Sequence, residues 1–362
     1  MNKKISMNQS QTNRQRFTFP KMDRIISNSI FLKSLFGLLL SFFILSTSYT
    51  SHASHYRGGS ITWQQQGSNT VKVTVKQYYR STYGFSPYPS GPTSYDPQIG
   101  SKYKADGGTL LYFGDGSYET IIFEVTSKNT TENWIEATFV TTHTYASAGS
   151  YTVYYGTCCR VSNLSGGNAD ANFVTQSTVT IGNANNSPVS SMPAILNFPS
   201  NVVSTYQIPA VDPDGDALSY SLAPLSETGP LYNYPSGASV SPTGLLTIDG
   251  SSLGNNSLWA LVVKVQDSKG AYVNLDFMVQ ISGTATPNNN VPLFDYAITP
   301  TNGHVYTVTA GTLLNFDVNA YDIDAGDNVL LSAVGMPSGA TLLQQQAIRY
   351  KVAFHGRLMP VK

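Results

Sequence analysis

Short segments in which hydrophobic and polar residues alternate run through most of the chain. In one example, Val71, Val73 and Val75 take every second position, with lysine or threonine between them. Similar segments span residues 150–157, 176–182, 258–267 and 274–283. Alternation at period two is typical of a β-strand with one buried face. We find no amphipathic helix of three turns after residue 53, so the pattern predicts an all-β protein.

Turn-forming residues separate these segments, since the chain holds 30 glycines and 19 prolines. Short strands broken by regular turns predict tandem immunoglobulin-like β-sandwiches. Residues 183–191 and 285–292 both carry the pattern Asn-Asn-x-Pro, and we interpret them as linkers. Their prolines, Pro188 and Pro292, lie 104 residues apart, which is the length of one sandwich domain.

The segments after the two linkers repeat one another. Each has an acidic turn, beginning at Asp212 or Asp322, and each continues with a Pro-Ser-Gly-Ala turn. Such repeats mark arrays of one structural unit. The predicted domains are an N-terminal module (54–182), a complete sandwich (192–284), an incomplete repeat (293–342) and an aberrant basic tail (343–362).

The incomplete repeat lacks the last two strands of its counterpart, and the tail after it lacks a turn and strand pattern. We interpret this as a domain cut short by truncation or a frameshift, with a divergent final domain as the alternative. Because a sandwich without its last strands leaves open edges and an exposed core, we expect residues 293–362 to be poorly folded.

The first 53 residues resemble an export signal. Basic residues precede an apolar run, Leu35 to Leu45, and small residues at Ser51 and Ala53 suit cleavage after Ala53. A run of this length is short for a spanning helix, although an N-terminal membrane anchor is the alternative. We therefore expect a secreted or cell-surface protein.

Charge is distributed unevenly along the chain. The formal net charge is zero, but residues 54–343 contain 10 bases and 20 acids. Nucleic-acid binding needs a basic surface that neutralises phosphates, so this acidic body argues against it. The same charge suits cations, or simply solubility.

Two motifs in the N-terminal module form a recognisable pair. Phe113-Gly114-Asp115-Gly116 is followed by His143, Tyr145, Gly149, Tyr151 and Val153 at the spacing H-x-Y-x-x-x-G-x-Y-x-V. This pair resembles the PKD domain, an immunoglobulin-like sandwich. With residues 54–63 and 155–164, it resembles the N-terminal module of secreted multidomain surface proteins of Bacteroidetes-type bacteria. The later repeats resemble cadherin-like or putative-Ig domains, and these resemblances imply an exported surface protein.

Carboxylates gather in the acidic turns, and calcium prefers six to eight oxygen ligands. We predict a calcium site at Asp212, Asp214 and Asp216, with Asn186 adding a carbonyl oxygen. A weaker second site would use residues Asp267, Asn290, Asp322, Asp324 and Asp327. In cadherins the linker carries more acids than the asparagines found here. The alternative is a polar turn whose aspartates and glycines only shape the backbone.

The two cysteines, Cys158 and Cys159, are adjacent, so they cannot connect distant strands. Either they form a vicinal disulfide or they are two thiols at a strand end. A second open question concerns the aromatic residues Tyr78, Tyr79, Tyr83, Phe85, Tyr88 and Tyr95. These rings could stack on sugar or protein, or they could cover the edge of a sandwich.

No catalytic motif is recognisable: His55, His143, His304 and His355 do not pair with a nucleophile in any known pattern. We therefore predict an exported, non-catalytic protein that binds an extracellular protein or polysaccharide, with adhesion as its role. The alternative is the carbohydrate-binding part of a secreted polysaccharide-degrading enzyme.

Overall fold

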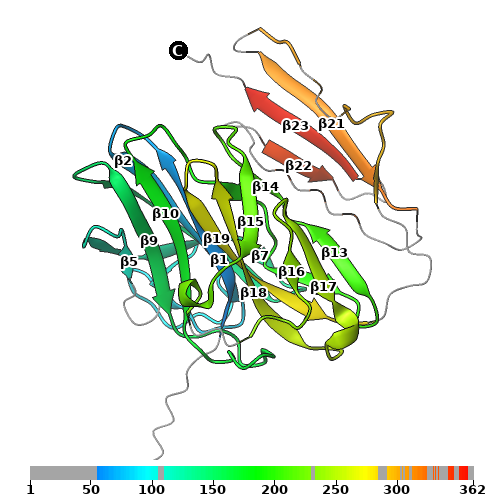
Figure 1. Cartoon of the computed structure of the whole chain (residues 1–362), viewed down its shortest axis with the longest axis horizontal. Helices are drawn as coiled ribbons and strands as arrows, with labels where there is room; N and C mark the ends of the chain where they lie inside the picture. Colours follow the sequence, from blue (N-terminus) through cyan, green and yellow to red (C-terminus); the bar gives the residue numbers. More distant parts are fainter. Residues whose placement is uncertain are drawn as a thin grey trace, which may run out of the picture. The chain divides into compact units, whose positions relative to one another are not determined.

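In the part of the chain that the structure describes, β-strands are joined by turns and two short 3-10 helices (Figure 1). This computed structural model describes residues 55–104, 110–229, 233–283, 292–301, 304, 306–309, 312–323, 329, 331, 333, 341–345 and 350–357. The predicted signal (1–53) and nearly all of the predicted linker 285–292 lie outside these ranges. Across the described ranges, no helix has the length and apolar character needed to cross a membrane. The prediction of an all-β fold with tandem immunoglobulin-like sandwiches is confirmed.

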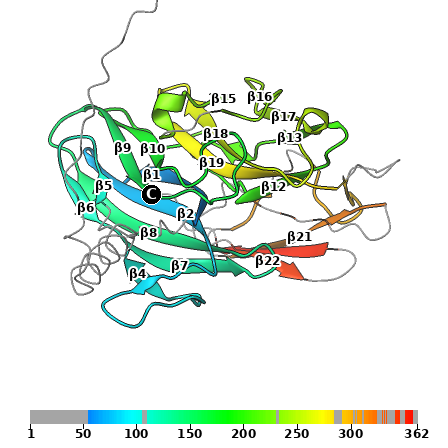
Figure 2. The same cartoon turned by 90° about the horizontal axis from the view of Figure 1, so that it is seen from below.

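The first sandwich has two layers with a hydrophobic core between them (Figure 2). One layer consists, in spatial order, of β3 (Ser86–Pro87), β4 (Lys102–Lys104), β7 (Ile122–Asn129), β8 (Trp134–Thr144), β2 (Thr70–Arg80) and β1 (Tyr56–Gln65). The other consists of β10 (Phe173–Ile181), β9 (Gly149–Thr157), β5 (Leu110–Tyr112) and β6 (Tyr118–Thr120). Val71, Val73 and Val75 of β2 are fully buried, as their alternation with polar residues predicts.

The paired motifs of the N-terminal module are in contact. His143 Nε2 lies 2.8 Å from Asp115 Oδ2, and the His143 ring stacks on Phe113 at a centroid distance of 4.0 Å. Tyr145 completes the contact by donating its hydroxyl hydrogen to the Phe113 carbonyl at 3.0 Å. The two motifs therefore join the β5–β6 turn to the end of β8.

The second sandwich also has two layers. One consists of β12 (Ile195–Phe198), β19 (Tyr272–Ile281), β18 (Leu258–Asp267) and β15 (Leu218–Leu222). The other consists of β13 (Val203–Gln207), β17 (Leu245–Asp249) and β16 (Ser239–Val240). A short pair, β11 (Val189–Ser190) with β14 (Ala210–Val211), and the 3-10 helices η2 (Leu225–Glu227) and η3 (Gly250–Ser252) complete it.

Strands β18 and β19 are buried on both faces. On one face, Leu261, Val263 and Phe277 belong to the core of the second sandwich. On the other face, Val262 and Met278 pack in a separate hydrophobic cluster. That cluster takes residues from the loop after β9 of the first sandwich: Val161, Leu164 and, partly buried, Ala169. Nearly continuous apolar runs such as these are typical of strands covered on both sides.

The two sandwiches are joined through strand β19. It pairs antiparallel with β1 at Gly59↔Asp276 and with β10 at Ser177↔Val273, so one 14-stranded sheet runs through both. Close approach here requires glycine: a Cβ atom on Gly58 would lie 2.3 Å from the Asp276 carbonyl oxygen, and the φ angle of Gly58 is 149°.

Residues 183–191, predicted as a linker, are packed against the first sandwich. Asn185 and Ser187 are almost fully buried. The Ser187 amide donates to the Trp63 carbonyl at 3.0 Å, and the Trp63 amide donates to Ser187 Oγ at 2.9 Å. The segment that connects the two sandwiches is thus packed against the first one, and its strand β11 (Val189–Ser190) pairs with β14 (Ala210–Val211) of the second.

Residues after 292 form a separate four-stranded sheet. Its spatial order is β20 (Leu293–Phe294), β21 (Leu313–Tyr321), β23 (Tyr350–Arg357) and β22 (Thr341–Gln345). The prediction that the tail after residue 342 lacks strands is wrong for residues 343–345 and 350–357. The alternation of Tyr350, Val352 and Phe354 is the strand signal that explains β23.

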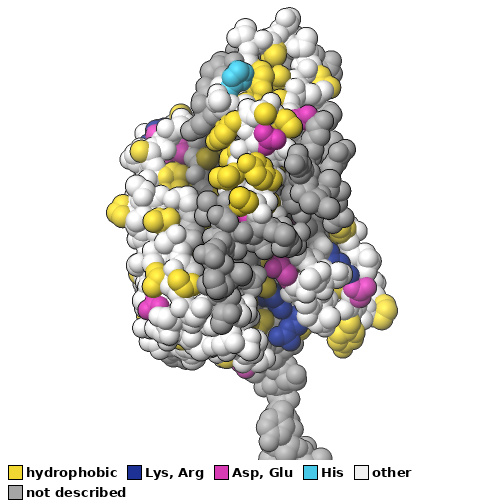
Figure 3. Space-filling view, turned by 90° about the vertical axis from the view of Figure 1, so that its right-hand side faces the viewer, with side chains coloured by type: hydrophobic (Ala, Val, Ile, Leu, Met, Phe, Trp, Pro, Cys, Tyr) yellow, Lys and Arg dark blue, Asp and Glu magenta, His cyan; other side chains and the backbone are white. Residues whose placement is uncertain are grey.

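Large hydrophobic side chains remain exposed in this C-terminal part. They include Phe294, Tyr296, Leu313 and Ile323, and Figure 3 shows hydrophobic side chains gathered on one face of the molecule. The expectation that the third repeat is incomplete stays a prediction from sequence.

Candidate functional site

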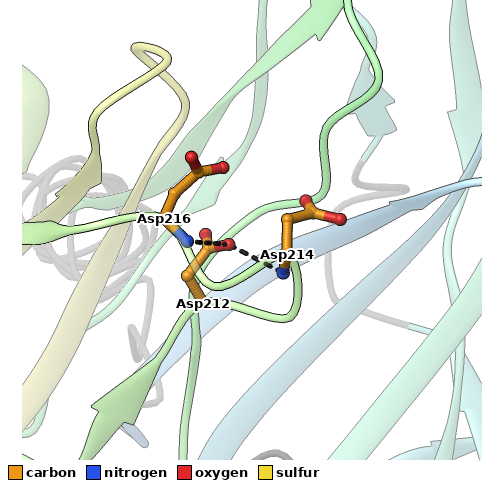
Figure 4. A group of neighbouring side chains, drawn as sticks. All are labelled: Asp212, Asp214 and Asp216. Carbon is orange, nitrogen blue, oxygen red and sulfur yellow. Dashed lines mark hydrogen bonds between the residues drawn. The ribbon is translucent and has the colours of Figure 1, made fainter.

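The aspartate turn, Asp212 to Asp216, connects β14 with β15 (Figure 4). Asp212 Oδ1 accepts hydrogen bonds from the amides of Asp214 at 2.8 Å and Asp216 at 3.2 Å, which is why the backbone folds back on itself. One carboxylate oxygen from each of the three aspartates lies within 4.8 Å of the others. The structure therefore brings together the three aspartates predicted to bind calcium. The Asn186 carbonyl oxygen, predicted as a further ligand, instead accepts from the Gln65 amide at 2.9 Å.

Most carboxylate oxygens of this turn are already occupied by protein donors. Asn186 donates its amide N–H to Asp214 Oδ2 at 2.6 Å and its side-chain N–H to Asp214 Oδ1 at 2.8 Å. Lys269 Nζ lies 2.9 Å from Asp216 Oδ2 and 3.2 Å from the Ala184 carbonyl. A calcium ion would have to displace this ammonium group, whereas Asp212 Oδ2 is buried without a hydrogen-bond partner.

The electrostatics of the turn reflect this crowding of charge. Burial raises the pKa of Asp212, and the nearby carboxylates Asp267 and Asp214 add to the effect. The ion pair with Asp216 raises the pKa of Lys269. The lysine thus supplies a positive charge to a cluster in which aspartates would otherwise repel each other.

Asp267, predicted for the second calcium site, lies instead beside the first. Its Oδ2 accepts from Asn185 Nδ2 at 2.8 Å, and its Oδ1 accepts from the amides of Lys269 and Ala271, both at 2.9 Å. Asp267 therefore holds the 183–191 segment and closes the β18–β19 turn. Both of its oxygens thus accept hydrogen bonds from nearby residues, and its part in a calcium site stays a prediction from sequence.

The remaining residues of the second predicted site are not brought together by the described structure. Asp322 follows strand β21. Asn290, Asp324 and Asp327 lie outside the described residues. The second calcium site therefore stays a prediction from sequence.

Cys158 and Cys159 are joined by a disulfide, with a cis peptide bond between them. The Cys159 carbonyl accepts hydrogen bonds from the amides of His55 at 3.1 Å and Tyr56 at 3.0 Å. The vicinal pair thus meets the start of β1. Immediately after it comes Arg160, which sequence reasoning left without a role.

Arg160 and Asp276 form an ion pair buried between the two sandwiches. Arg160 is 0% exposed and Asp276 is 4% exposed. The contact is bidentate: Arg160 Nη1 donates to Asp276 Oδ1 at 3.0 Å, and Nη2 donates to Oδ2 at 2.6 Å. Tyr56 donates its hydroxyl hydrogen to Asp276 Oδ2 at 3.2 Å, and its ring stacks on Phe173.

Each member of this pair stabilises the charged form of the other against the effect of burial. Burial raises the pKa of Asp276, and the guanidinium of Arg160 acts in the opposite direction. Burial also disfavours the charge on Arg160, but Asp276 outweighs it and raises the pKa of Arg160. A single aspartate within the apolar run of β19 was the available sequence signal for this pair, since a buried charge needs a partner.

The aromatic residues at the end of β2 and in the stretch between β2 and β5 differ in burial. Tyr78, Tyr79 and Phe85 are buried, and Tyr79 and Phe85 belong to the core of the first sandwich. Tyr83 packs against that core. Tyr88 and Tyr95 are exposed, and they lie on the layer opposite β9 and β10.

Tyr88 borders a groove of about 520 Å³ on the outer face of β4, β7 and β8. Its walls also include Ile122, Phe139 and the ion pair between Lys102 and Glu124. Because both signs of charge and apolar groups share the groove, it offers no single ligand chemistry.

Comparisons with known proteins connect the first sandwich to one family. Residues 57–182 match the family described as integrin beta-like protein A-E, N-terminal. Integrin beta-like protein A of Dictyostelium discoideum is 26% identical over 355 residues, covering 85% of this chain and 17% of that protein. Integrin beta-like protein C of the same organism is 30% identical over 263 residues, covering 68% of this chain and 12% of that protein. The chain thus spans less than a fifth of the length of these relatives.

Among solved structures, the N-terminal Ig1-2 module of the Drosophila receptor protein tyrosine phosphatase DLAR has a TM-score of 0.23. It is 10% identical and covers 61% of this chain and 97% of that one; a likeness this weak carries no argument. The relatives do not support an origin among PKD modules of Bacteroidetes-type bacteria. Over residues 57–182, the chain is similar to the N-terminal region of integrin beta-like proteins A to E.

Proposed function

We propose that the chain is an extracellular, non-catalytic adhesion protein whose paired sandwiches present binding surfaces on a rigid body. The observation that carries this proposal is the match of residues 57–182 to the integrin beta-like family. The name of the relatives points to adhesion, and the buried junction through Arg160 and Asp276 supports a fixed arrangement of the two sandwiches. Residues 1–53 would direct export, with cleavage after Ala53.

An attachment assay with the full chain tests this proposal. Beads coated with the secreted protein would be mixed with cells of the producing organism, and beads coated with an unrelated immunoglobulin-like protein would serve as the control. We expect saturable attachment that the free chain competes away. Attachment equal to that of the control beads would contradict an adhesive role.

Calcium binding at the aspartate turn is a second, separate proposal. Three aspartate oxygens within 4.8 Å and the unpartnered Asp212 Oδ2 favour it, while Lys269 competes for the same position. Calcium would supply only a structural link there. We expect millimolar calcium to raise the melting temperature of a Lys269→Met variant more than that of the natural chain. Equal responses, or none, would refute calcium binding at this turn.

A further inference from the structure

A row of tyrosines crosses the outer face of the first sandwich. Tyr118, Tyr112 and Tyr154 come from β6, β5 and β9, and the strand register places them directly opposite one another: Tyr112↔Tyr118 and Tyr112↔Tyr154. Their ring centroids lie 5.9 and 4.8 Å apart, respectively. We call these three residues the tyrosine row.

The row continues across two more strands. Gln176 of β10 lies opposite Tyr154, and its side-chain N–H donates to the Tyr272 hydroxyl of β19 at 2.6 Å. Lys264 of β18 is the last residue in this direction, and its Nζ lies 4.1 Å from the centroid of the Tyr272 ring. Because neighbouring strands lie about 4.8 Å apart, five strands span roughly 19 Å.

The tyrosines stand among small neighbours. In the register of β9 and β10, the position on one side of the Tyr154–Gln176 pair holds Gly156 with Val174, and the position on the other side holds Thr152 with Thr178. The rings therefore form a ridge. Tyr112 and Tyr154 stack on each other with an interplanar angle of 10°, so these two rings cover one another's faces. Tyr118 is 62% exposed and Tyr154 is 37% exposed, which leaves the Tyr118 ring and part of Tyr154 open to solvent.

This face carries no charged side chain on its outward positions of β5, β6, β9 and β10. Glu119 on β6 is bound by the Thr141 hydroxyl at 2.6 Å, and Asp115 in the adjoining turn is paired with His143. The outward side chains are phenols, threonine and serine hydroxyls, one amide and the partly exposed apolar groups of Leu110 and Val174. Such a surface complements a neutral partner rich in hydroxyl groups, because these four strands offer a charged partner no opposite charge. The Lys264 ammonium at the end of the line is already paired with Glu227 at 2.6 Å.

The shape of the row also restricts the partner. A stable protein interface covers about 800 Å² per partner, whereas the row is long and one side chain wide. A narrow line of rings and hydroxyls fits an extended chain. We propose that the tyrosine row binds a neutral, extended polysaccharide, through contact of the tilted Tyr118 ring with the apolar face of a sugar and hydrogen bonds between the row's hydroxyls and those of the polymer. This deepens the proposed binding function and rests on it.

Sedimentation with insoluble polysaccharides tests this inference. The full secreted chain would be mixed with cellulose, chitin and an insoluble β-1,3-glucan, and the bound fraction measured with and without the double change Tyr118→Ala and Tyr154→Ala. The matched control is Tyr88→Ala, which removes a tyrosine of similar exposure, 49%, from the other layer of the first sandwich. Thermal melting would verify that each variant folds.

We expect binding to at least one of these polymers, a loss of at least tenfold in the double variant and no change in Tyr88→Ala. Three results would overturn the proposal. They are binding to none of the polymers, a loss caused by Tyr88→Ala instead, and equal binding by the double variant.

The attachment assay separates this inference from the proposed function. If beads still attach to cells while all three polymers fail to bind, the polysaccharide proposal alone is wrong. If the tyrosine changes also abolish that attachment, the row binds a protein. If the beads do not attach at all, the adhesive function itself fails.

Discussion

The two sandwiches meet in two regions that treat charge differently. In the buried region, Arg160 and Asp276 face each other with almost no access to water. In the exposed region, the aspartate turn holds Asn186 and Lys269 at the surface. The buried region connects β1 and the loop after β9 to the second sandwich, through Tyr56 and Arg160. The exposed region connects the segment after β10 to it, through Asn186. The energetic consequences differ because a buried charge without a partner is costly, whereas an exposed one is hydrated.

The largest effect should follow from Arg160→Met. This change leaves the Asp276 carboxylate buried and unpaired, so we expect a loss of about 3–5 kcal/mol in the free energy of unfolding. The double change Arg160→Met with Asp276→Leu should recover most of it, because no isolated charge remains. Denaturant unfolding measures both. A loss below about 1 kcal/mol in the single variant would contradict the importance of the pair.

Gly58→Ala should have the next largest effect. A Cβ at this position collides with the backbone of Asp276, so β1 must move away from β19. We expect a loss of about 1–3 kcal/mol, as for other overpacked sites. Gly254→Ala is the control, because a Cβ there meets no atom within 4 Å, and its unfolding free energy should change by less than about 0.5 kcal/mol. Equal effects of the two changes would show that this close approach is unimportant.

A small effect is expected from Asp214→Ala in the exposed region. The change removes both hydrogen bonds to Asn186, and water can replace them. The unfolding free energy should fall by about 1 kcal/mol or less. A loss as large as that of Arg160→Met would mean that the exposed region, rather than the buried pair, holds the sandwiches together.

The smallest expected change in stability concerns the exposed carboxylate of Asp115, and it depends on pH. Burial opposes its charge, but hydrogen bonds from Ser117 and His143 prevail and lower its pKa from 3.8 to about 2. A lowered pKa stabilises the folded state above pH 4, and this contribution is lost as the pH falls towards 2. We expect Asp115→Asn to show a weaker drop in melting temperature between pH 4 and pH 2 than the natural chain. Identical drops would exclude this carboxylate as a source of acid sensitivity.

The sequence predicted the aspartate turn but not the buried ion pair. The aspartate turn is encoded within five residues, so its geometry followed from local spacing. Arg160 and Asp276 are separated by 116 residues, and nothing local connects them. The tyrosine row joins residues from separate strands, so it depends on strand register, which the alternating pattern alone does not define. Likewise, the runs in β18 and β19 indicated strands, but only the packing of the loop after β9 shows why both faces are apolar.

The central structural claim is that the first two sandwiches unfold as one unit. Native-state hydrogen exchange on the full chain tests it most directly, by comparing the amides of β2 (Thr70–Arg80) with those of β18 (Leu258–Asp267) as denaturant is added. We predict that the most protected amides of both strands open with the same free energy, and that Arg160→Met lowers both equally. Opening of one strand at a clearly lower free energy, while the other stays protected, would contradict the claim.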